Sequence, residues 1–512
     1  MSVSAASTTP FSLMRRFWLF VAVVMLFTFV ALSWAYLASP VFFDHVEPQM
    51  ASISWYFYHG QPLYHDPNGG ELYMMPYGPF AYALNGLVES SLGGSILSGK
   101  LAGVVAINLA LLAAYGLFRK YASRSTAIIA AGFVAAYWIS TCYLSLSDRP
   151  DSFLILFVLV GLWASTQPSW TGAMLLGLSL GICLNLKIHS PLYFLPLACF
   201  ALRAGMGWMR LFACGALALL LFFLPFLVVP NLSWNNFLWE LSTTTHEGYR
   251  RDLLEKNVLW LGLAFTPVLV LIGSSLVNNA ATTRGILRQH WMSLVGVLVA
   301  AGLLALLGSK NGSGPPHLMP YVAVIVFFGL YLWQAGLDIS WRSSGRFMAA
   351  AIVVFCCLFA TFSYGYVKIY QAFRALNGAS ATEAKSVEAD ILDILQRRGT
   401  DHLLLMGVGD RESYPQTYLR ELLVFHGMPM GITVVPVIDW RQAGVAHPDL
   451  DRMREILAQS HPGKDIIWLI PKGTVPFSFV FNADFRSTFA KEYALRESTA
   501  HFDLYFERAA TP

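Results

Sequence analysis

The chain has 512 residues, of which 56% are apolar and only 12% are charged, and its mean hydropathy is +0.54. Soluble domains average roughly 25% charged residues, so this composition excludes an ordinary cytosolic enzyme and a disordered chain. The same shortage of charged residues excludes a nucleic-acid binder, and the placement of the small net charge of +4 matters more than its sum. Because a transmembrane helix takes about 20 apolar residues, the composition predicts a polytopic α-helical membrane protein.

Apolar runs predict eleven membrane spans. They lie near residues 16–38, 99–118, 125–145, 152–166, 172–187, 190–203, 211–229, 258–277, 291–308, 318–337 and 347–367. The first run follows Arg15 and Arg16 and resembles a signal peptide. It is long, however, and ends at a poor cleavage site, so we expect a membrane anchor. All six cysteines fall inside apolar runs, which indicates neither a disulfide framework nor a zinc site.

The charged residues predict which way each loop faces. With a cytoplasmic N-terminus, the inner loops hold most of the basic residues, as the positive-inside rule requires. Among the acids of the membrane region, only Asp338 falls on the inner side. The outer acids are Asp44, Glu47, Asp66, Glu71, Glu89, Asp148, Asp151, Glu240, Glu247, Asp252 and Glu255. This one-sided placement predicts a polar site on the outer face.

From about residue 368 the chain becomes more polar, and short apolar strands alternate with helices. The expected strands are 402–408, 432–436 and 465–470, and the expected helices are 379–398, 414–427 and 449–459. This alternation predicts a small α/β domain, and an odd number of spans places it outside. We therefore expect a membrane domain, residues 1–367, and a C-terminal periplasmic domain, residues 368–512.

The first outer loop, residues 39–98, is the richest in candidate chemistry. Asp44 and Glu47 stand at the start of an amphipathic, aromatic run, residues 49–58, which is typical of an interfacial helix. Pro48 suits the first turn of that helix. Two interpretations are open here. Asp44 caps the helix while Glu47 favours its dipole, or the two acids belong to a site at the membrane surface.

A second acidic cluster, Ser147–Ser152, separates two apolar runs. Asp148 is a candidate helix cap, and Pro150 fits the first turn of the next span. Asp151 would then lie at the positive end of that helix, where an ion is costly unless it is paired or functional. A plain salt bridge with Arg149 is the structural alternative.

Basic residues complete the outer rim. Lys187 and His189 interrupt an apolar run, at a depth where charge is expensive. Lys310 and His317 lie in a glycine-rich turn, a backbone that can hold a phosphate, and Tyr249–Arg251 adds two more cations. Carboxylates and cations on one face suit transfer from a lipid-linked phosphate. An acceptor hydroxyl needs a carboxylate to take its proton, and a departing polyprenyl phosphate needs cations.

These motifs resemble bacterial GT-C glycosyltransferases over roughly residues 10–330. The similar segments are the acidic pair after the first span, Gly60–Tyr64, Tyr77–Pro79, Arg149–Asp151, Lys187, Lys310–Gly312 and Pro320–Tyr321. One departure concerns the adjacent Asp-Glu pair of the family, which here is spread over Asp44-His45-Val46-Glu47. Alignment on Gly60 and Tyr64 favours Glu47 as the counterpart, and Asp44 is the alternative.

The resemblance, closest to the family 39-like group that includes lipid A and lipopolysaccharide-modifying enzymes, implies a specific reaction. A sugar passes with inversion from a polyprenyl-phosphate donor to a hydroxyl of a glycan, lipid or protein, at the outer face of the bacterial inner membrane. Glu47 or Asp44 is the expected general base, and Asp151 positions the acceptor or shares that role.

The remaining residue roles follow from the same resemblance and from the charge pattern. The expected donor-phosphate ligands are Arg149, Lys187, Lys310, His189 and His317, and the expected acceptor or sugar contacts are Asp148, Tyr64 and Tyr77. The choice between no cofactor and a divalent cation, Mg²⁺ or Mn²⁺, is open. The C-terminal domain is expected to bind acceptor or partner.

Other functional classes predict different patterns. A transporter or flippase of lipid-linked substrates predicts ionisable groups near the bilayer midplane, whereas these acids cluster at the outer edge. A non-catalytic envelope assembly protein would tolerate replacement of each outer acid. An O-antigen ligase or polymerase would show a large late periplasmic loop rather than an acidic first loop.

Overall fold

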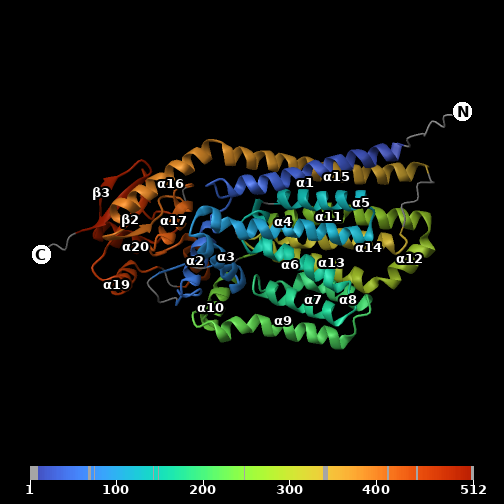
Figure 1. Ribbon diagram of the computed structural model, residues 1–512, viewed down its shortest axis with the longest axis horizontal. Coiled ribbons are helices and arrows are strands. Elements are labelled where there is room, and N and C mark those ends of the chain that lie inside the picture. Colours follow the sequence, from blue (N-terminus) through green and yellow to red (C-terminus); the bar gives the residue numbers. More distant parts are fainter. Residues whose placement is uncertain are drawn as a thin grey trace.

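In the computed structural model the chain forms a long helical bundle with a small sheet domain at one end (Figure 1). The described residues are 10–66, 71–73, 75–141, 143–147, 149–246, 248–337, 344–411, 414–445 and 448–508. Asp148, a predicted acceptor-binding residue, lies outside them. The sheet lies at the end of the long axis opposite the start of α1 (Pro10–Leu37).

Each of the eleven predicted spans coincides with one helix, beginning with α1. The others are α4 (Ile96–Tyr121), α5 (Arg124–Thr141), α6 (Pro150–Ser165), α7 (Trp170–Leu184), α8 (Pro191–Arg203), α9 (Trp208–Val228), α11 (Arg251–Asn278), α13 (Trp291–Leu307), α14 (Met319–Gln334) and α15 (Ser344–Asn377). Within the described ranges, six helical stretches are long and apolar enough to cross a membrane, or seven if α12 (Ala280–Gln289) and α13, bent by 73°, form one span. The helices α6, α7 and α8 are apolar but shorter. The chain is a multi-pass membrane protein, as its composition predicts.

Small residues let the bundle helices approach closely, as membrane helix packing requires. A Cβ on Gly132 of α5 would lie 2.7 Å from the Cβ of Ala22 in α1. Between α7 and α9, a Cβ on Gly177 would lie 2.7 Å from the carbonyl oxygen of Cys214. Larger side chains at these glycines would push the helices apart.

Short helices cover the end of the bundle that faces the sheet domain (Figure 1). They are α2 (Val46–Tyr58), α3 (Pro79–Leu92), α10 (Trp234–Thr244) and the single turns η1 (Tyr143–Ser145) and η2 (Pro315–Leu318). The predicted helix at 49–58 is confirmed as α2. It packs closely on α3, because a Cβ on Gly86 would lie 2.4 Å from the carbonyl oxygen of Ser54.

The C-terminal region forms the predicted α/β domain around a four-stranded sheet. Its strands, in sheet order, are β1 (His402–Met406), β2 (Asp465–Pro471), β4 (Phe502–Glu507) and β3 (Tyr493–Ser498). Strands β1 and β2 are parallel, with Leu404 opposite Ile467, and the other pairs are antiparallel. The helices are α16 (Ala379–Arg398), η3 (Thr417–Arg420), α17 (Glu421–Phe425), α18 (Val434–Ala443), α19 (Leu450–Ser460) and α20 (Ala483–Glu492).

Alternate strand residues bury the two faces of this sheet separately. Leu403 and Leu405 join a core with Trp468 and helices α18, α19 and α20. Leu404 and Ile467 face the other way and pack against α16 and α17. The domain therefore has helices on both faces of the sheet.

Several features of this region differ from the sequence expectation. The predicted helix 414–427 is wrong in its bounds, since η3 and α17 together cover only Thr417–Phe425. The predicted strand 432–436 is wrong, because Ile432 makes only a single bridge to Leu72 and α18 begins at Val434. Strands β3 and β4 were not expected at all. The proposed boundary at residues 367 and 368 falls inside α15, which continues to Asn377, so the division into two domains stays a prediction.

Backbone hydrogen bonds hold the C-terminal domain on the first outer loop. The Leu72 amide donates to the Gly431 carbonyl at 2.8 Å, and the Thr433 amide donates to the Leu72 carbonyl at 2.9 Å. In addition, the side-chain amide of Gln49 in α2 donates to the Thr433 hydroxyl at 2.9 Å. These contacts fix the domain above the segment that carries the candidate site.

Candidate active site

Asp44 and Arg149 form an ion pair between the start of α2 and the start of α6. Asp44 precedes the helix, and its carboxylate also accepts a 3.3 Å hydrogen bond from the Val46 amide and lies 2.9 Å from the His45 Nδ1. Arg149 has an extended backbone that leads into Pro150, the first residue of α6. The predicted cap is wrong, because His45 occupies the N-cap position of α2 and no side chain caps this helix end. Asp44 instead faces the second acidic cluster through Arg149, and its place in a site stays a prediction.

Asp151 is 1% exposed and is shared by two cations. Lys187, just after α7, donates a 2.7 Å hydrogen bond to Oδ1, and the Arg149 Nε lies 3.4 Å from Oδ2. The first turn of α6 also favours a negative charge, because the helix dipole is positive there. The salt bridge predicted as a structural alternative therefore exists, and it links Asp44, Arg149, Asp151 and Lys187 in one chain of charges.

Tyr77 contacts both cations of this chain of charges. Its hydroxyl accepts a 3.0 Å hydrogen bond from Arg149, and the Lys187 ammonium lies 5.3 Å from the centre of its ring. The approach depends on Gly78, where a Cβ would lie 2.4 Å from the Asn185 carbonyl oxygen. Glycine after Tyr77 is what allows the first outer loop to reach the loop that carries Lys187.

Tyr64 positions the Tyr77 backbone through a hydrogen bond. It is 1% exposed, and its hydroxyl donates a 2.8 Å hydrogen bond to the Tyr77 carbonyl. Its ring lies among Phe226 and Phe237, with centroid distances of 6.1 and 4.9 Å. This placement fits a positioning residue, and a direct contact of Tyr64 with sugar stays a prediction.

The predicted basic residues of the later loops lie near Lys187. His189 and His317 face each other, with 3.3 Å between Nε2 and Nδ1. Burial lowers the pKa of His189 well below its usual value, and the charges of His317, Lys187 and Lys310 lower it further. The glycine-rich turn is fixed by a backbone bridge between Lys310 and Tyr249. Burial also lowers the pKa of His317, and the charges of Lys187, Arg149 and Lys310 lower it further. The five residues expected to bind the donor phosphate therefore lie near one another, and their role as ligands stays a prediction.

Glu47, three residues from Asp44, has hydrogen-bond partners outside this cluster, although the charge of Arg149 still acts on its pKa. It is fully buried, and it accepts hydrogen bonds from the Tyr36 hydroxyl and, at 3.0 Å, from the Phe43 amide. Burial raises the pKa of Glu47 to about 7, against the opposing charge of Lys100. By contrast, burial alone would raise the pKa of Asp44, but the Arg149 guanidinium and the His45 hydrogen bond outweigh it and hold that pKa well below its usual value.

Lys100 also belongs to this region, although its sequence context did not identify it as a candidate site residue. It is fully buried in α4, and its ammonium donates to the carbonyls of Ser39 at 2.7 Å and Val41 at 2.8 Å. Lys100 and Glu47 together hold the segment that leads into Asp44. A lysine inside an apolar run is costly unless it is paired or functional, and that cost was the one signal available in the sequence.

The carboxylates of the site are already occupied by cations of the chain. Asp44 is paired with Arg149, and Asp151 with Arg149 and Lys187. Across the part of the chain that the structure describes, no group of three His, Cys, Asp or Glu side chains could hold a metal ion. In this arrangement the carboxylates of the site do not fit a bound Mg²⁺ or Mn²⁺.

Solved structures resemble the whole chain. ArnT from Cupriavidus metallidurans bound to undecaprenyl phosphate aligns with a TM-score of 0.56 at 14% sequence identity, over 96% of this chain and 98% of that one. Its apo structure gives a TM-score of 0.54, also at 14% identity, over 95% and 97% of the two chains. The chain has the GT-C fold. The fold expected from the sequence motifs is thus confirmed.

A more distant GT-C structure is the apo oligosaccharyltransferase of Archaeoglobus fulgidus, with a TM-score of 0.48 and 11% identity, over 89% of this chain and 69% of that one. No protein-family model and no curated protein matches the sequence.

Proposed function

We propose that this GT-C protein transfers a sugar from a polyprenyl-phosphate donor to an acceptor hydroxyl. The observation that carries the proposal is the chain of charges Asp44–Arg149–Asp151–Lys187, at the end of the bundle beneath the C-terminal domain. It combines a partly exposed carboxylate with two cations, the groups that proton transfer and phosphate departure require. Undecaprenyl phosphate, which is bound in the ArnT structure, is the donor carrier that we infer.

Asp44 is the general base in this proposal. Its side chain is 15% exposed and is ionised at neutral pH, so an approaching hydroxyl can reach it and donate a proton to it. The acceptor oxygen forms a bond to the anomeric carbon while the bond from that carbon to the phosphate oxygen breaks. The proton goes to Asp44, the bond electrons go to the phosphate, and the configuration at the anomeric carbon inverts.

Arg149 and Lys187 stabilise the charge of the departing phosphate. An ammonium has three donors and a guanidinium has five, so both cations can keep their contacts with Asp151 while donating to a phosphate. Asp151, 1% exposed, positions these cations rather than the acceptor. Lys310, His189 and His317 surround the same region and extend the phosphate site.

Glu47 serves as a positioning residue in this scheme. Its carboxylate holds the Tyr36 hydroxyl and the Phe43 amide, and so it shapes the segment that ends at Asp44. The sequence alignment favoured Glu47 as the base, whereas full burial separates it from a substrate at the outer surface.

The orientation follows from the charge distribution. We propose that the N-terminus is cytoplasmic and that the C-terminal domain is periplasmic, in the bacterial inner membrane. The acceptor then belongs to the cell envelope, as a glycan, a lipid such as lipid A, or a protein.

A binding measurement tests the donor class without knowledge of the sugar. We expect undecaprenyl phosphate to raise the unfolding temperature of the purified protein in nanodiscs. The Lys187→Met variant should lose most of this shift, and Lys310→Met part of it. Exposed Lys491→Met in the C-terminal domain is the matched control and should retain it. An equal shift in all variants would contradict the phosphate site.

A further inference from the structure

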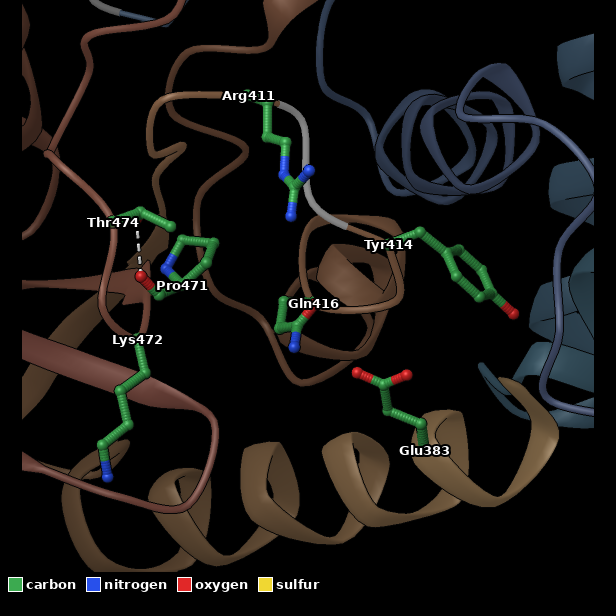
Figure 2. A pocket seen from close by; sticks show the side chains of 7 residues that line it. All are labelled: Glu383, Arg411, Tyr414, Gln416, Pro471, Lys472 and Thr474. Carbon is green, nitrogen blue, oxygen red and sulfur yellow. Dashed lines mark hydrogen bonds between the residues drawn. The ribbon is translucent and has the colours of Figure 1, made fainter. Parts of the chain in front are cut away.

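A partly open cavity of about 390 Å³ lies in the C-terminal domain (Figure 2). Its lining residues are Glu383, Arg411, Tyr414, Gln416, Pro471, Lys472 and Thr474. Apart from Glu383 of α16, they end or follow β1 and β2, the two parallel strands. Ligands of open α/β sheets bind outside the carboxyl ends of parallel strands, so the cavity lies where this topology favours a binding site.

The walls of this cavity are tied together by backbone contacts. The Phe477 amide donates to the Val408 carbonyl at 2.8 Å, and the Phe479 amide donates to the Gly409 carbonyl at 3.0 Å. A Cβ on Gly409 would lie 2.0 Å from the Thr474 hydroxyl oxygen, so only glycine lets the two loops meet. The loops after β1 and β2 therefore form one preorganised wall.

The groups that face the cavity are polar and balanced in charge. Figure 2 shows the Arg411 guanidinium, the Gln416 amide and the Glu383 carboxylate directed toward the same space. The Lys472 ammonium turns away and donates a 2.6 Å hydrogen bond to the Thr499 carbonyl. A phosphate would meet the like charge of Glu383, and an amine that of Arg411. A neutral polyol, whose hydroxyls both donate and accept, matches the guanidinium, amide and carboxylate together.

Aromatic rings connect this cavity with the candidate active site. Tyr414 in the wall packs edge-on against Tyr418 at 4.9 Å, and Tyr418 lies 6.5 Å from the ring of His45, which contacts Asp44. The Tyr414 hydroxyl is buried and makes no hydrogen bond with any residue that the structure describes. It points toward the N-terminal segments in Figure 2. Three side chains thus separate the cavity from the candidate base.

We propose that this cavity binds a neutral saccharide unit of the acceptor and holds it while another part of the acceptor reaches Asp44. This assignment to the acceptor rests on the proposed function. The donor sugar does not suit this role, because in the proposed function its phosphate lies at Arg149 and Lys187. Arg149 contacts Asp44, which the rings of Tyr414, Tyr418 and His45 separate from the cavity. The cavity therefore selects acceptors that carry a neutral sugar.

Saturation-transfer NMR on the full-length protein in nanodiscs tests this site with free glucose, galactose, mannose and their disaccharides. We expect at least one of these sugars to bind, and Glu383→Ala or Arg411→Ala to weaken its binding about tenfold or more. Both side chains are exposed at the rim, so folding should be unaffected. Lys472→Ala, on the same rim but turned away, is the matched control and should bind normally.

Competition distinguishes the source and class of the ligand. Inorganic phosphate should not displace the sugar, and Glu383→Ala should bind undecaprenyl phosphate like the unmodified protein. Asp44→Asn should retain sugar binding whether or not Asp44 is the base, which separates a failure of this site from a failure of the proposed function. The proposal is overturned if no sugar binds, if both cavity variants bind normally, or if phosphate displaces the sugar and Lys472→Ala weakens binding.

Discussion

Lys187, in the segment after α7, donates a 2.7 Å hydrogen bond to Asp151 in the first turn of α6, and the Arg149 Nε lies 3.4 Å from the second oxygen of the same carboxylate. One buried acid therefore sets the place of two cations. The same guanidinium pairs with Asp44, so the candidate base and the candidate phosphate ligands form one unit. The variants below are chosen to separate the contributions of its members.

Replacing Lys187 by Met should weaken both donor binding and folding. The variant leaves Asp151 buried with Arg149 alone, and breaking a buried pair costs about 3–5 kcal/mol. The double variant Lys187→Met with Asp151→Asn should recover stability but not the binding of undecaprenyl phosphate. Thermal unfolding with and without this lipid measures both effects. Recovery of binding in the double variant would show that Lys187 serves folding only.

Gly78→Ala should reduce activity without touching a charged residue. The added Cβ would meet the backbone of Asn185 at 2.4 Å, so the loop must move and carry Tyr77 away from Arg149 and Lys187. A displacement of about 1 Å can cost roughly 100-fold in rate. Gly262→Ala, where a Cβ meets nothing within 4 Å, is the control. Equal rates in both variants would argue against a role for the Tyr77 contact.

Glu47 and Glu71 should each contribute a stability that is lost as pH rises from about 4.5 to about 7. Burial raises the pKa of Glu47 and of Glu71 from the usual 4.5 to about 7. In this interval each of these two acids binds more protons in the folded state than in the unfolded state, so its contribution to the free energy of unfolding decreases with pH. Burial lowers the pKa of His189 and His317, and these groups act in the opposite direction, so the variants are compared with the unmodified protein. Glu47→Gln and Glu71→Gln should each make the unfolding temperature fall less, or rise more, with pH across this range. Slopes unchanged in both variants would contradict the assignment of the dependence to these two acids.

Chelation should leave the transfer reaction unchanged. The chain supplies Arg149 and Lys187 as the cations of the site, and both carboxylates are already paired with them. Assays with an excess of EDTA, and with added Mg²⁺ or Mn²⁺, measure the dependence. Loss of activity that either ion restores would assign a metal to the site and would require the ion pairs to open.

Much of the site could be predicted because charge is expensive at the membrane. Arg149, Asp151 and Lys187 stand out inside or beside apolar runs, and the structure pairs them as that cost requires. The spans were equally visible, since each apolar run coincides with one helix. The predicted ion pair and the membrane spans could therefore be read from the sequence, because each follows from the cost of placing charge in or beside an apolar run.

Other features depend on contacts that are remote in the sequence. Glu47 lies only three residues from Asp44, yet its separate burial depends on Lys100, which comes from a different helix. The single bridge of Ile432 depends on Leu72, and no local pattern distinguishes it from a short strand. Strand β3, with its polar sequence Tyr493–Ser498, is half exposed at the sheet edge, so it lacks the apolar run by which strands were identified.

A transfer assay tests most directly the claim that this protein transfers a sugar with Asp44 as the general base. The protein in nanodiscs is given undecaprenyl-phosphate-linked sugars, and the release of undecaprenyl phosphate is measured. With the unmodified protein and an envelope lipid extract as acceptor, we expect release that depends on the acceptor. Asp44→Asn should lower the rate by about 100-fold or more while binding undecaprenyl phosphate normally, and Glu47→Gln should retain most of the activity. Full activity of Asp44→Asn, or no release by the unmodified protein with any of the donors, would contradict the account.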